Sequence, residues 1–372
     1  MLAYRHAFHA GNHADVLKHA VALFCLDYLQ QKPVALTVVD THGGAGRYTV
    51  DARLVRDKAE FQTGVGRLWP MKDAGMPPLI RRYMNEVRQI NDDLLQWIPG
   101  SPLLLAQGLR PIDSLRACEI HPTDYPLLEE TLSPFGRKVK ALKSDGFDQL
   151  KAALPPVSRR GLVLMDPSFE IKTDYDKVIG AIRDAVTRFS SGCYVIWLPM
   201  LQRFEVDRFV RQAMALPVQN KLHIAFRVRD PLKDGLGLMG SHLVILNPPF
   251  GLQQACQAAL PWLVKQLGQD PSASFELLTE AKAFMPASQQ TRPARRPATK
   301  AAAKPATPSP SNRSARPTGN TYPKIPPIEK GRCGSPPFCV VDGWITPVTS
   351  PCYPQPSLGN VSWGSPPQKF FF

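Results

Sequence analysis

Four residues near the middle of the chain, Asp166 to Phe169, have the groups needed to hold an aromatic amine. They follow the apolar run Gly161–Met165 and read Asp-Pro-Ser-Phe. The carboxylate of Asp166 can accept one hydrogen of an exocyclic amino group and the carbonyl of Pro167 the other, while Phe169 offers a ring to stack on the base. Acceptors fixed in this way act through orientation and electrostatics. The four residues therefore indicate chemistry at the amino group of a base such as adenine.

The same residues are a close variant of Asp/Asn-Pro-Pro-Tyr/Phe, the signature of enzymes that methylate exocyclic amino groups. Asp166 is therefore the candidate catalytic residue, and Pro167 and Phe169 are candidate substrate-binding residues. A strand followed by a tight turn explains so short a motif as well, because proline and serine are ordinary turn residues. A second match, Asn247-Pro-Pro-Phe250, fits the signature more literally. The predicted strand order favours Asp166, because Asn247 closes a strand near the far end of the sheet.

Three further acids end apolar runs that read as strands buried on both faces. Asp40 opens into the glycine-rich segment Thr41–Gly46, and Glu119 and Asp145 end the next two runs. Glycine lets a nucleotide-like ligand approach the backbone closely, although the full Gly-x-Gly-x-x-Gly pattern is missing. Glu119 could bind two ribose hydroxyls, and Asp145 an adenine amino group. With Asp166, these acids follow the order of an S-adenosylmethionine site: methionine end, ribose, adenine and methyl acceptor.

Alternating apolar runs and helical patterns predict an α/β fold with a mostly parallel, doubly wound sheet, whose ligands gather at the carboxyl ends of the strands. The expected strands are Val34–Asp40, Ser114–Glu119, Lys138–Asp145, Gly161–Asp166, Gly192–Leu198, Lys221–Val228 and His242–Leu246. The expected helices are Asn12–Gln31, with Asn12 as N-cap, Tyr125–Leu132 and Phe147–Ala153.

The interval from Arg47 to Leu109 is too long for one helix between two strands, so a helical subdomain is expected there. A helical pattern over Leu79–Trp97 carries three arginines, Arg81, Arg82 and Arg88. These side chains predict either a basic face that touches a substrate or a solvated helical flap.

The C-terminal part of the 372-residue chain differs in composition from the rest. From Thr291 onward it has 17 of the 38 prolines and 11 lysines and arginines against two acids, which is +9 of the formal charge of +14. Such a composition cannot assemble a packed core. We therefore predict a folded domain at residues 1–285 and a basic, Pro/Ala-rich disordered tail at residues 286–372. Its end, Cys333–Phe372, shows no helical or strand period, which indicates either a non-native sequence or an unusual extension.

Other features restrict the class of protein. The domain keeps a charge of about +5, which permits nucleic-acid binding. No apolar run is long enough to span a membrane, and the N-terminus is no signal peptide. Widely spaced cysteines suit a reducing cytosol.

His9 and His13 are four residues apart, as in a zinc pair. No nearby Cys or Glu completes a ligand set, so no metal is expected. Lys18 and His19 could face the carboxylate of a bound amino-acid moiety.

Several longer motifs occur together with the short signature: Tyr4–His19, Asp40–Tyr48, Pro99–Pro102, Glu119–Pro126 and Leu154–Gly161. In these motifs the chain resembles the RlmJ family of bacterial 23S ribosomal RNA adenine-N6 methyltransferases, over residues 1 to about 270. The family usually has Pro-Pro-Tyr after the aspartate, where this chain has Pro167-Ser168-Phe169. The tail has no counterpart in the family.

The resemblance implies a cytoplasmic, monomeric, Rossmann-like class I methyltransferase that uses S-adenosylmethionine and has an inserted helical subdomain. Its expected partner is 23S rRNA, free or in an assembly intermediate, in which it methylates one specific adenine. The resemblance makes Asp166 catalytic and puts Tyr4 and His6 near the target base. It implies cofactor contacts at Lys18, His42, Ser101, Glu119, Asp145 and Gly146.

Two alternatives stay open. An enzyme of the same chemistry could act on DNA, and the basic tail does not distinguish the two substrates. A noncatalytic RNA-binding or ribosome-assembly protein could have kept the fold and lost activity through Ser168. Phe169 lacks the hydroxyl of the family's tyrosine, so turnover could be lower, but both hydrogen-bond acceptors are retained. The residues leave open whether Asp166 removes a proton or only orients the amine.

Overall fold

The computed structural model describes residues 5–170, 172–202, 204–231, 237–279, 340–341 and 344–345. The chain divides into two compact units, Met1–Arg296 and Pro297–Phe372. In the second unit, β11 (Val340–Val341) pairs with β12 (Trp344–Ile345) in an antiparallel manner. Apart from these two strands, the predicted tail at residues 286–372 lies outside the described residues, and so does Tyr4.

An eight-stranded sheet forms the centre of the first unit, in the order β10-β8-β9-β7-β6-β1-β4-β5. Five neighbouring strands, β7, β6, β1, β4 and β5, are parallel, whereas β9 runs antiparallel to both β7 and β8. The mostly parallel, doubly wound sheet predicted from the sequence is therefore confirmed. The strands are β1 (Thr37–Asp40), β4 (Ser114–Cys118), β5 (Val139–Leu142), β6 (Gly161–Met165), β7 (Cys193–Met200), β8 (Lys221–Arg227), β9 (Gly240–Leu246) and β10 (Ser274–Leu278).

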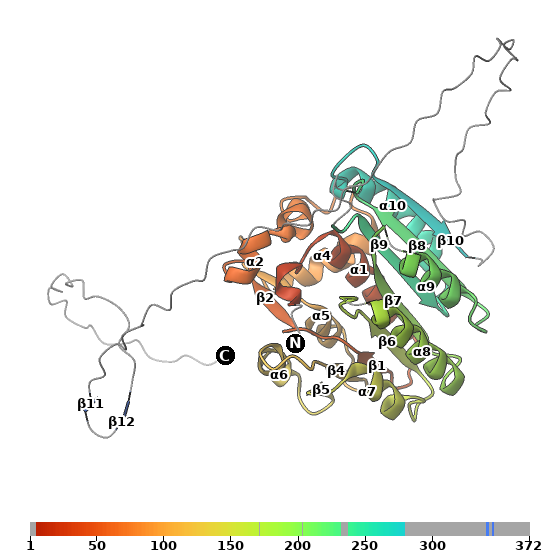
Figure 1. Cartoon of the computed structure of the whole chain (residues 1–372), viewed down its shortest axis with the longest axis horizontal. Coiled ribbons are helices and arrows are strands. Elements are labelled where there is room, and N and C mark those ends of the chain that lie inside the picture. Colours follow the sequence, from red (N-terminus) through yellow and green to blue (C-terminus); the bar gives the residue numbers. More distant parts are fainter. Residues whose placement is uncertain are drawn as a thin grey trace, which may run out of the picture. The chain divides into compact units, whose positions relative to one another are not determined.

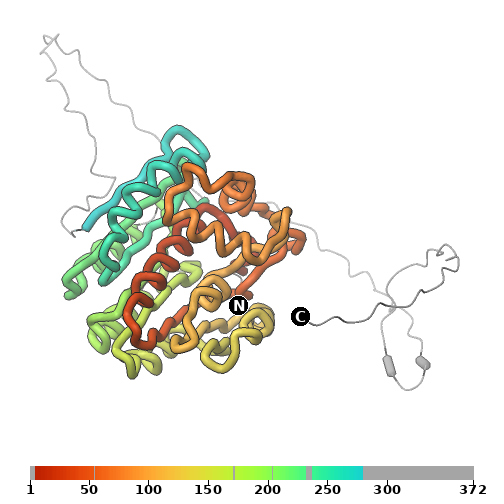
Figure 2. The backbone as a smooth tube through the Cα atoms, turned by 180° about the vertical axis from the view of Figure 1, so that it is seen from behind, coloured from red at the N-terminus to blue at the C-terminus, as the bar shows by residue number. Residues whose placement is uncertain are grey.

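Helices cover both faces of this sheet, which is why β6, β7 and β9 are buried along their whole length. On one face lie α1 (His13–Leu29), α5 (Ser101–Gln107) and α10 (Leu252–Leu267), seen in front in Figure 2. On the other face lie α7 (Gly146–Ala153), α8 (Lys172–Arg188) and α9 (Phe204–Met214), and Figure 1 shows α8 and α9 in green. The helix α6 (Asp124–Leu132) packs beside β5. Among the described residues, none of the helices has the length and apolar character needed to cross a bilayer.

The first helix is buried along most of its length, because it is packed between the sheet and α4 (Pro78–Gln89). Its N-cap is Asn12, as predicted, and the side-chain oxygen accepts hydrogen bonds from the backbone N–H groups of Ala14 and Asp15. This cap fixes the first turn of α1, and that turn carries Asp15 towards the carboxyl edge of the sheet.

The long interval between β1 and β4, where a helical insertion was expected, contains two short strands and several helices. The strands β2 (Arg47–Thr49) and β3 (Trp97–Pro99) pair at its base. Between them lie α2 (Arg53–Lys58), η2 (Glu60–Thr63), α3 (Val65–Leu68) and α4. The expected helix over Leu79–Trp97 is too long: α4 ends at Gln89, and the side chain of Asn91 turns the chain by bonding the backbone of Val87, Gln96 and Trp97.

Two of the three arginines expected on a basic face are held within the protein. Arg82 bonds Asp27 at 2.8 Å and also contacts Glu86, and Arg88 lies 2.5 Å from Asp73. These ion pairs fix α4 against its neighbours, so the structure favours a structural role for Arg82 and Arg88.

Candidate active site

The four acids predicted at strand ends lie at one edge of the sheet. Asp40 is the last residue of β1, and Glu119 and Asp166 directly follow β4 and β6. Asp145 comes after β5 and caps α7, where its Oδ1 accepts the N–H of Phe147 at 2.7 Å. Because β5, β4, β1 and β6 are adjacent and parallel, their carboxyl ends bring these side chains to a common edge.

A small hollow of about 90 Å³ opens at this edge. The Glu119 carboxylate lines it, with Oε2 accepting the N–H of Gly44 at 2.8 Å and Oε1 that of His121 at 2.7 Å. Burial raises the pKa of Glu119, and these two hydrogen bonds only partly offset that effect. The other lining residues are His6, His42, Ile120, Asp124, Asp166 and Ser168.

The backbone comes close to this hollow at two glycines. Gly44 has φ +58°, and a Cβ there would lie 2.2 Å from the hydroxyl of Tyr48. A Cβ on Gly146 would lie 2.1 Å from the carbonyl oxygen of Thr41. A side chain at either position would clash with these atoms, so only glycine allows the backbone to pack this closely beside the end of β1.

The predicted residues around the end of β1 are brought together. Burial raises the pKa of Asp40 to about 6, and Oδ2 accepts no hydrogen bond from the described residues. Ser101, the first residue of α5, is buried and interacts with the same carboxyl. Burial lowers the pKa of His42 to about 4, which leaves its ring neutral near pH 7. A buried carboxylate oxygen without a donor is a position where a ligand amine or hydroxyl would bind.

A second hollow, of about 210 Å³, adjoins the first. Both are lined by His6, Asp166 and Ser168. The second is also lined by His9, Asn12, Ala14, Asp15, Lys18, Phe169, Glu170, Trp197, Pro199, Leu201 and Leu238. Asp166 thus stands where the two hollows meet.

Lys18 lies in the second hollow rather than the first. Its Nζ atom donates to Oδ2 of Asp166 and, at 2.7 Å, to Oδ1 of Asp15. Burial alone would lower the pKa of Lys18, but the two carboxylates more than offset this and raise it, so the ammonium stays charged. The contact with Asp166 was not predicted, because α1 and β6 are far apart in the sequence.

One group of side chains among the described residues has the spacing of a metal site. The ligand atoms of His6, Asp15 and Asp166 lie within 4.8 Å of one another. The Lys18 ammonium contacts both carboxylates of this group. The positive charge that the carboxylates require is therefore supplied by the protein itself.

The stacking role expected for Phe169 does not fit its position. The residue has φ +50°, and its ring is only 2% exposed. The left-handed backbone directs the ring into the core, where it packs on Tyr175 with centroids 4.7 Å apart and on Phe209 at 6.2 Å. Trp197 lines the second hollow, and its ring lies 5.8 Å from the Nζ atom of Lys18. Within an apolar strand, Trp197 gave no signal of a site.

Pro167 is buried between Asp166 and Ser168. His6, predicted near the target base, lines both hollows together with Asp166, and its Nε2 atom lies 3.1 Å from Oδ2 of Asp15. Asp15 itself was not predicted as a site residue.

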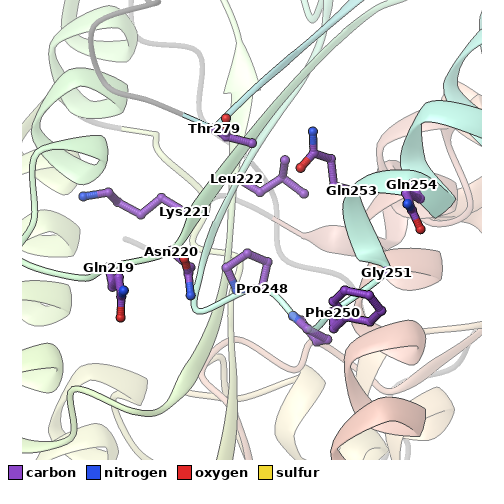
Figure 3. Close-up of a pocket in the computed structure, with 11 residues that line it drawn as sticks. Gln219, Asn220, Lys221, Leu222, Pro248, Phe250, Gly251, Gln253, Gln254 and Thr279 are labelled. Atoms are coloured by element: carbon purple, nitrogen blue, oxygen red, sulfur yellow. The ribbon is translucent and has the colours of Figure 1, made fainter.

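The second match to the signature lies at the opposite edge of the sheet. Leu246, at the end of β9, pairs with Tyr194 near the start of β7, because these strands are antiparallel. The side-chain amide of Asn247 donates to the carbonyls of Ser190 and Gly192, both at 2.7 Å. Pro248 and Phe250 line an open pocket there (Figure 3). Strand direction, rather than distance along the sheet, excludes Asn247 from the site.

Replacing Asn247 by glycine is expected to leave the predicted methyl transfer unchanged. It should lower the free energy of unfolding by about 1–3 kcal/mol, because two hydrogen bonds of about 0.5–1.5 kcal/mol each are lost. Glycine tolerates the φ of +52° found at this position. Urea denaturation and a methylation assay on the same preparation would measure both quantities. Loss of activity without loss of stability would contradict the structural role of Asn247.

Comparisons with known proteins agree with this architecture. A family model described as ribosomal RNA large subunit methyltransferase D, RlmJ, matches residues 33–278. A protein named ribosomal RNA large subunit methyltransferase J from Escherichia coli is 41% identical over 268 residues, which cover 72% of this chain and 94% of that protein. Its namesake from Haemophilus influenzae is 40% identical over 277 residues, covering 74% and 97%. The crystal structure of a Legionella pneumophila protein aligns with a TM-score of 0.68 at 32% identity, covering 74% of this chain and 99% of that one.

Proposed function

We propose that this protein, which belongs to the RlmJ family of ribosomal RNA large subunit methyltransferases, transfers a methyl group from S-adenosylmethionine to the exocyclic amino group of one adenine in 23S rRNA. The observation that carries the proposal is the position of Asp166, which lines both hollows at the carboxyl edge of the sheet. A group placed there can touch a base in one hollow and face a methyl donor in the other. We infer that it acts as a cytoplasmic monomer, on free rRNA or on an assembly intermediate, through a domain at residues 1–285.

The side chains in the first hollow, together with those at the neighbouring ends of β1 and β5, fit the cofactor by their chemistry. A carboxylate has about four acceptor positions, so Glu119 can bind two ribose hydroxyls in addition to its two backbone donors. Asp145 and Gly146 would border the adenine, and Asp40, with its unoccupied Oδ2, would take the amine of the methionine end beside His42 and Ser101. When bound, S-adenosylmethionine supplies an electrophilic methyl group. The resemblance implies that Lys18 contacts the cofactor. We place Lys18 instead on the side of the target base, because it contacts Asp166.

The second hollow would receive the target base, extruded from its stack. Asp166 and the carbonyl of Pro167 would each accept one N–H of the amine, which directs the nitrogen lone pair towards the first hollow. That lone pair would form the new N–C bond while the bond between sulfur and the methyl group breaks and leaves a neutral thioether. The nitrogen would then lose one proton, to Asp166 or to water. Phe169 and Trp197 both line this hollow, but the Phe169 ring packs on Tyr175 and Phe209, and Trp197 is the more exposed of the two. We therefore assign the stacking ring to Trp197, with His6 beside the base.

Deleting the gene tests the function directly. We expect 23S rRNA from the deletion strain to lack one N6-methyladenosine, measured by mass spectrometry of its nucleosides. Returning the gene should restore the modification, and a gene encoding the Asp166→Ala variant should not. An unchanged nucleoside profile would favour the noncatalytic RNA-binding alternative.

The DNA alternative needs a separate comparison. We expect the purified protein to methylate an RNA fragment that carries the target and to leave the matching oligodeoxynucleotide unmodified. Equal rates on the two substrates would instead favour a DNA adenine methyltransferase.

A further inference from the structure

The carboxylate of Asp15 is buried close to Asp166, and both of its oxygens accept hydrogen bonds. The residue is only 2% exposed in the first turn of α1. Its Oδ1 accepts from the Nζ atom of Lys18 at 2.7 Å, and its Oδ2 accepts from the N–H of Gly11 at 2.8 Å and lies 3.1 Å from Nε2 of His6. A buried carboxylate with this number of partners has a fixed orientation. The methyl-transfer step proposed for Asp166 does not involve Asp15.

Lys18 connects this carboxylate to Asp166. Its Nζ atom lies between Oδ1 of Asp15 and Oδ2 of Asp166. No other hydrogen bond to the Asp166 side chain is found within the described part of the chain, so Lys18 fixes that carboxylate. Since the ammonium holds Oδ2, the other oxygen, Oδ1, is left for the amine of the substrate.

We propose that Asp15 is a positioning residue, which holds Lys18 and His6 in place and thereby orients Asp166 towards the target amine. The proposal rests on the proposed methyltransferase function and adds to it the residue that preorganises Asp166. Asp15 itself does not touch the substrate in this scheme, because it acts through Lys18.

The charges of the cluster agree with this role. Burial would raise the pKa of Asp15, but Lys18, His6 and His19 lower it well below its ordinary value, so the carboxylate is charged. Burial would lower the pKa of His6, and Lys18 acts in the same direction, but Asp15 and Asp166 together raise it. Without the anion of Asp15, the Lys18 ammonium would be held from one side only, by Asp166, so neither Lys18 nor Asp166 would keep a unique orientation.

The variant Asp15→Asn removes the charge and keeps the shape. We expect kcat on 23S rRNA to fall about 100-fold, the size expected when a reacting group is misplaced by about 1 Å, and KM for both substrates to stay unchanged. The matched control is Asp113→Asn, because Asp113 is equally buried and bonded to Arg110, Gln30 and the N–H of Leu36 at the other edge of the sheet. The control should lose stability and keep kcat. Equal kcat in Asp15→Asn and the wild type would overturn the proposal.

A double variant separates positioning from a general structural effect. If Asp15 acts through Lys18, kcat of Asp15→Asn/Lys18→Met should equal that of Lys18→Met alone, because the same interaction is lost in both. Additive losses would overturn the proposal. A crystal structure of Asp15→Asn should show Lys18 displaced and Asp166 in another orientation or in more than one. An Asp166 carboxylate oriented as in the wild type would overturn the proposal even if the wild type did not methylate rRNA. A wild-type protein without activity would count against the proposed function alone.

Discussion

Replacing Asp166 by alanine is expected to lower the rate of rRNA methylation by about a thousandfold or more, while S-adenosylmethionine still binds. A single preorganised hydrogen-bond partner of a transition state contributes about 100- to 1,000-fold, and Asp166 also orients the base. Glu119, which follows β4 in the first hollow, and Asp145, which caps α7, keep their own backbone partners in the variant. Cofactor affinity should therefore stay close to that of the wild type.

Single-turnover methylation of an rRNA fragment measures the rate, and calorimetric titration measures the affinity for the cofactor. The variant Asn247→Gly is the matched control, since it alters the other copy of the signature and should keep full activity. An Asp166→Ala protein that methylates at the wild-type rate would remove Asp166 from the mechanism. One that fails to bind the cofactor would show that Asp166 supports the first hollow instead.

The variant Asp166→Asn distinguishes orientation from proton abstraction. An amide oxygen can accept an N–H of the amine, but it cannot take a proton at neutral pH. If Asp166 only orients the amine, the asparagine variant should keep a rate well above that of the alanine variant. Equal rates for the two would instead assign proton abstraction to Asp166.

The edge of the sheet that holds the site was predictable because it depends on local patterns. Strands buried on both faces are apolar runs, and the first polar residue after each run marks a carboxyl end. This is why Asp40, Glu119 and Asp166 were placed correctly relative to one another. The N-cap at Asn12 was predictable for the same reason, since a cap depends on its own turn.

Contacts between distant segments were not predictable in this way. The Asp15–Lys18–Asp166 cluster joins α1 to β6, and nothing local in the sequence links those two elements. The orientation of Phe169 depends on one left-handed backbone angle, and a short motif does not report that angle. The direction of β9, which places Asn247 at the wrong edge, follows from its pairing with β7 rather than from its composition.

Replacing Gly146 by alanine is the second change with a large expected effect. The added methyl group would lie 2.1 Å from the backbone oxygen of Thr41, at the end of β1, and 2.6 Å from the Cβ atom of the same residue. Backbone cannot move aside as a flexible side chain does, so α7 must shift away from β1. We expect the shift to cost about 1–3 kcal/mol of folding stability and to separate Asp145 from His42 across the first hollow. The dissociation constant of S-adenosylmethionine should then rise about tenfold or more, since each 1.4 kcal/mol changes it tenfold.

Gly180→Ala is the matched control, because a Cβ at this position in α8 meets nothing within 4 Å. Alanine forms helix better than glycine by about 1 kcal/mol, so the control should be slightly more stable and bind the cofactor normally. Thermal unfolding and calorimetric titration would compare the two variants. Wild-type cofactor affinity in the Gly146→Ala protein would mean that the cofactor does not lie between β1 and α7. A loss of cofactor affinity that leaves rRNA binding intact would support the assignment of the two hollows, because Gly146 begins α7 and does not line the second hollow.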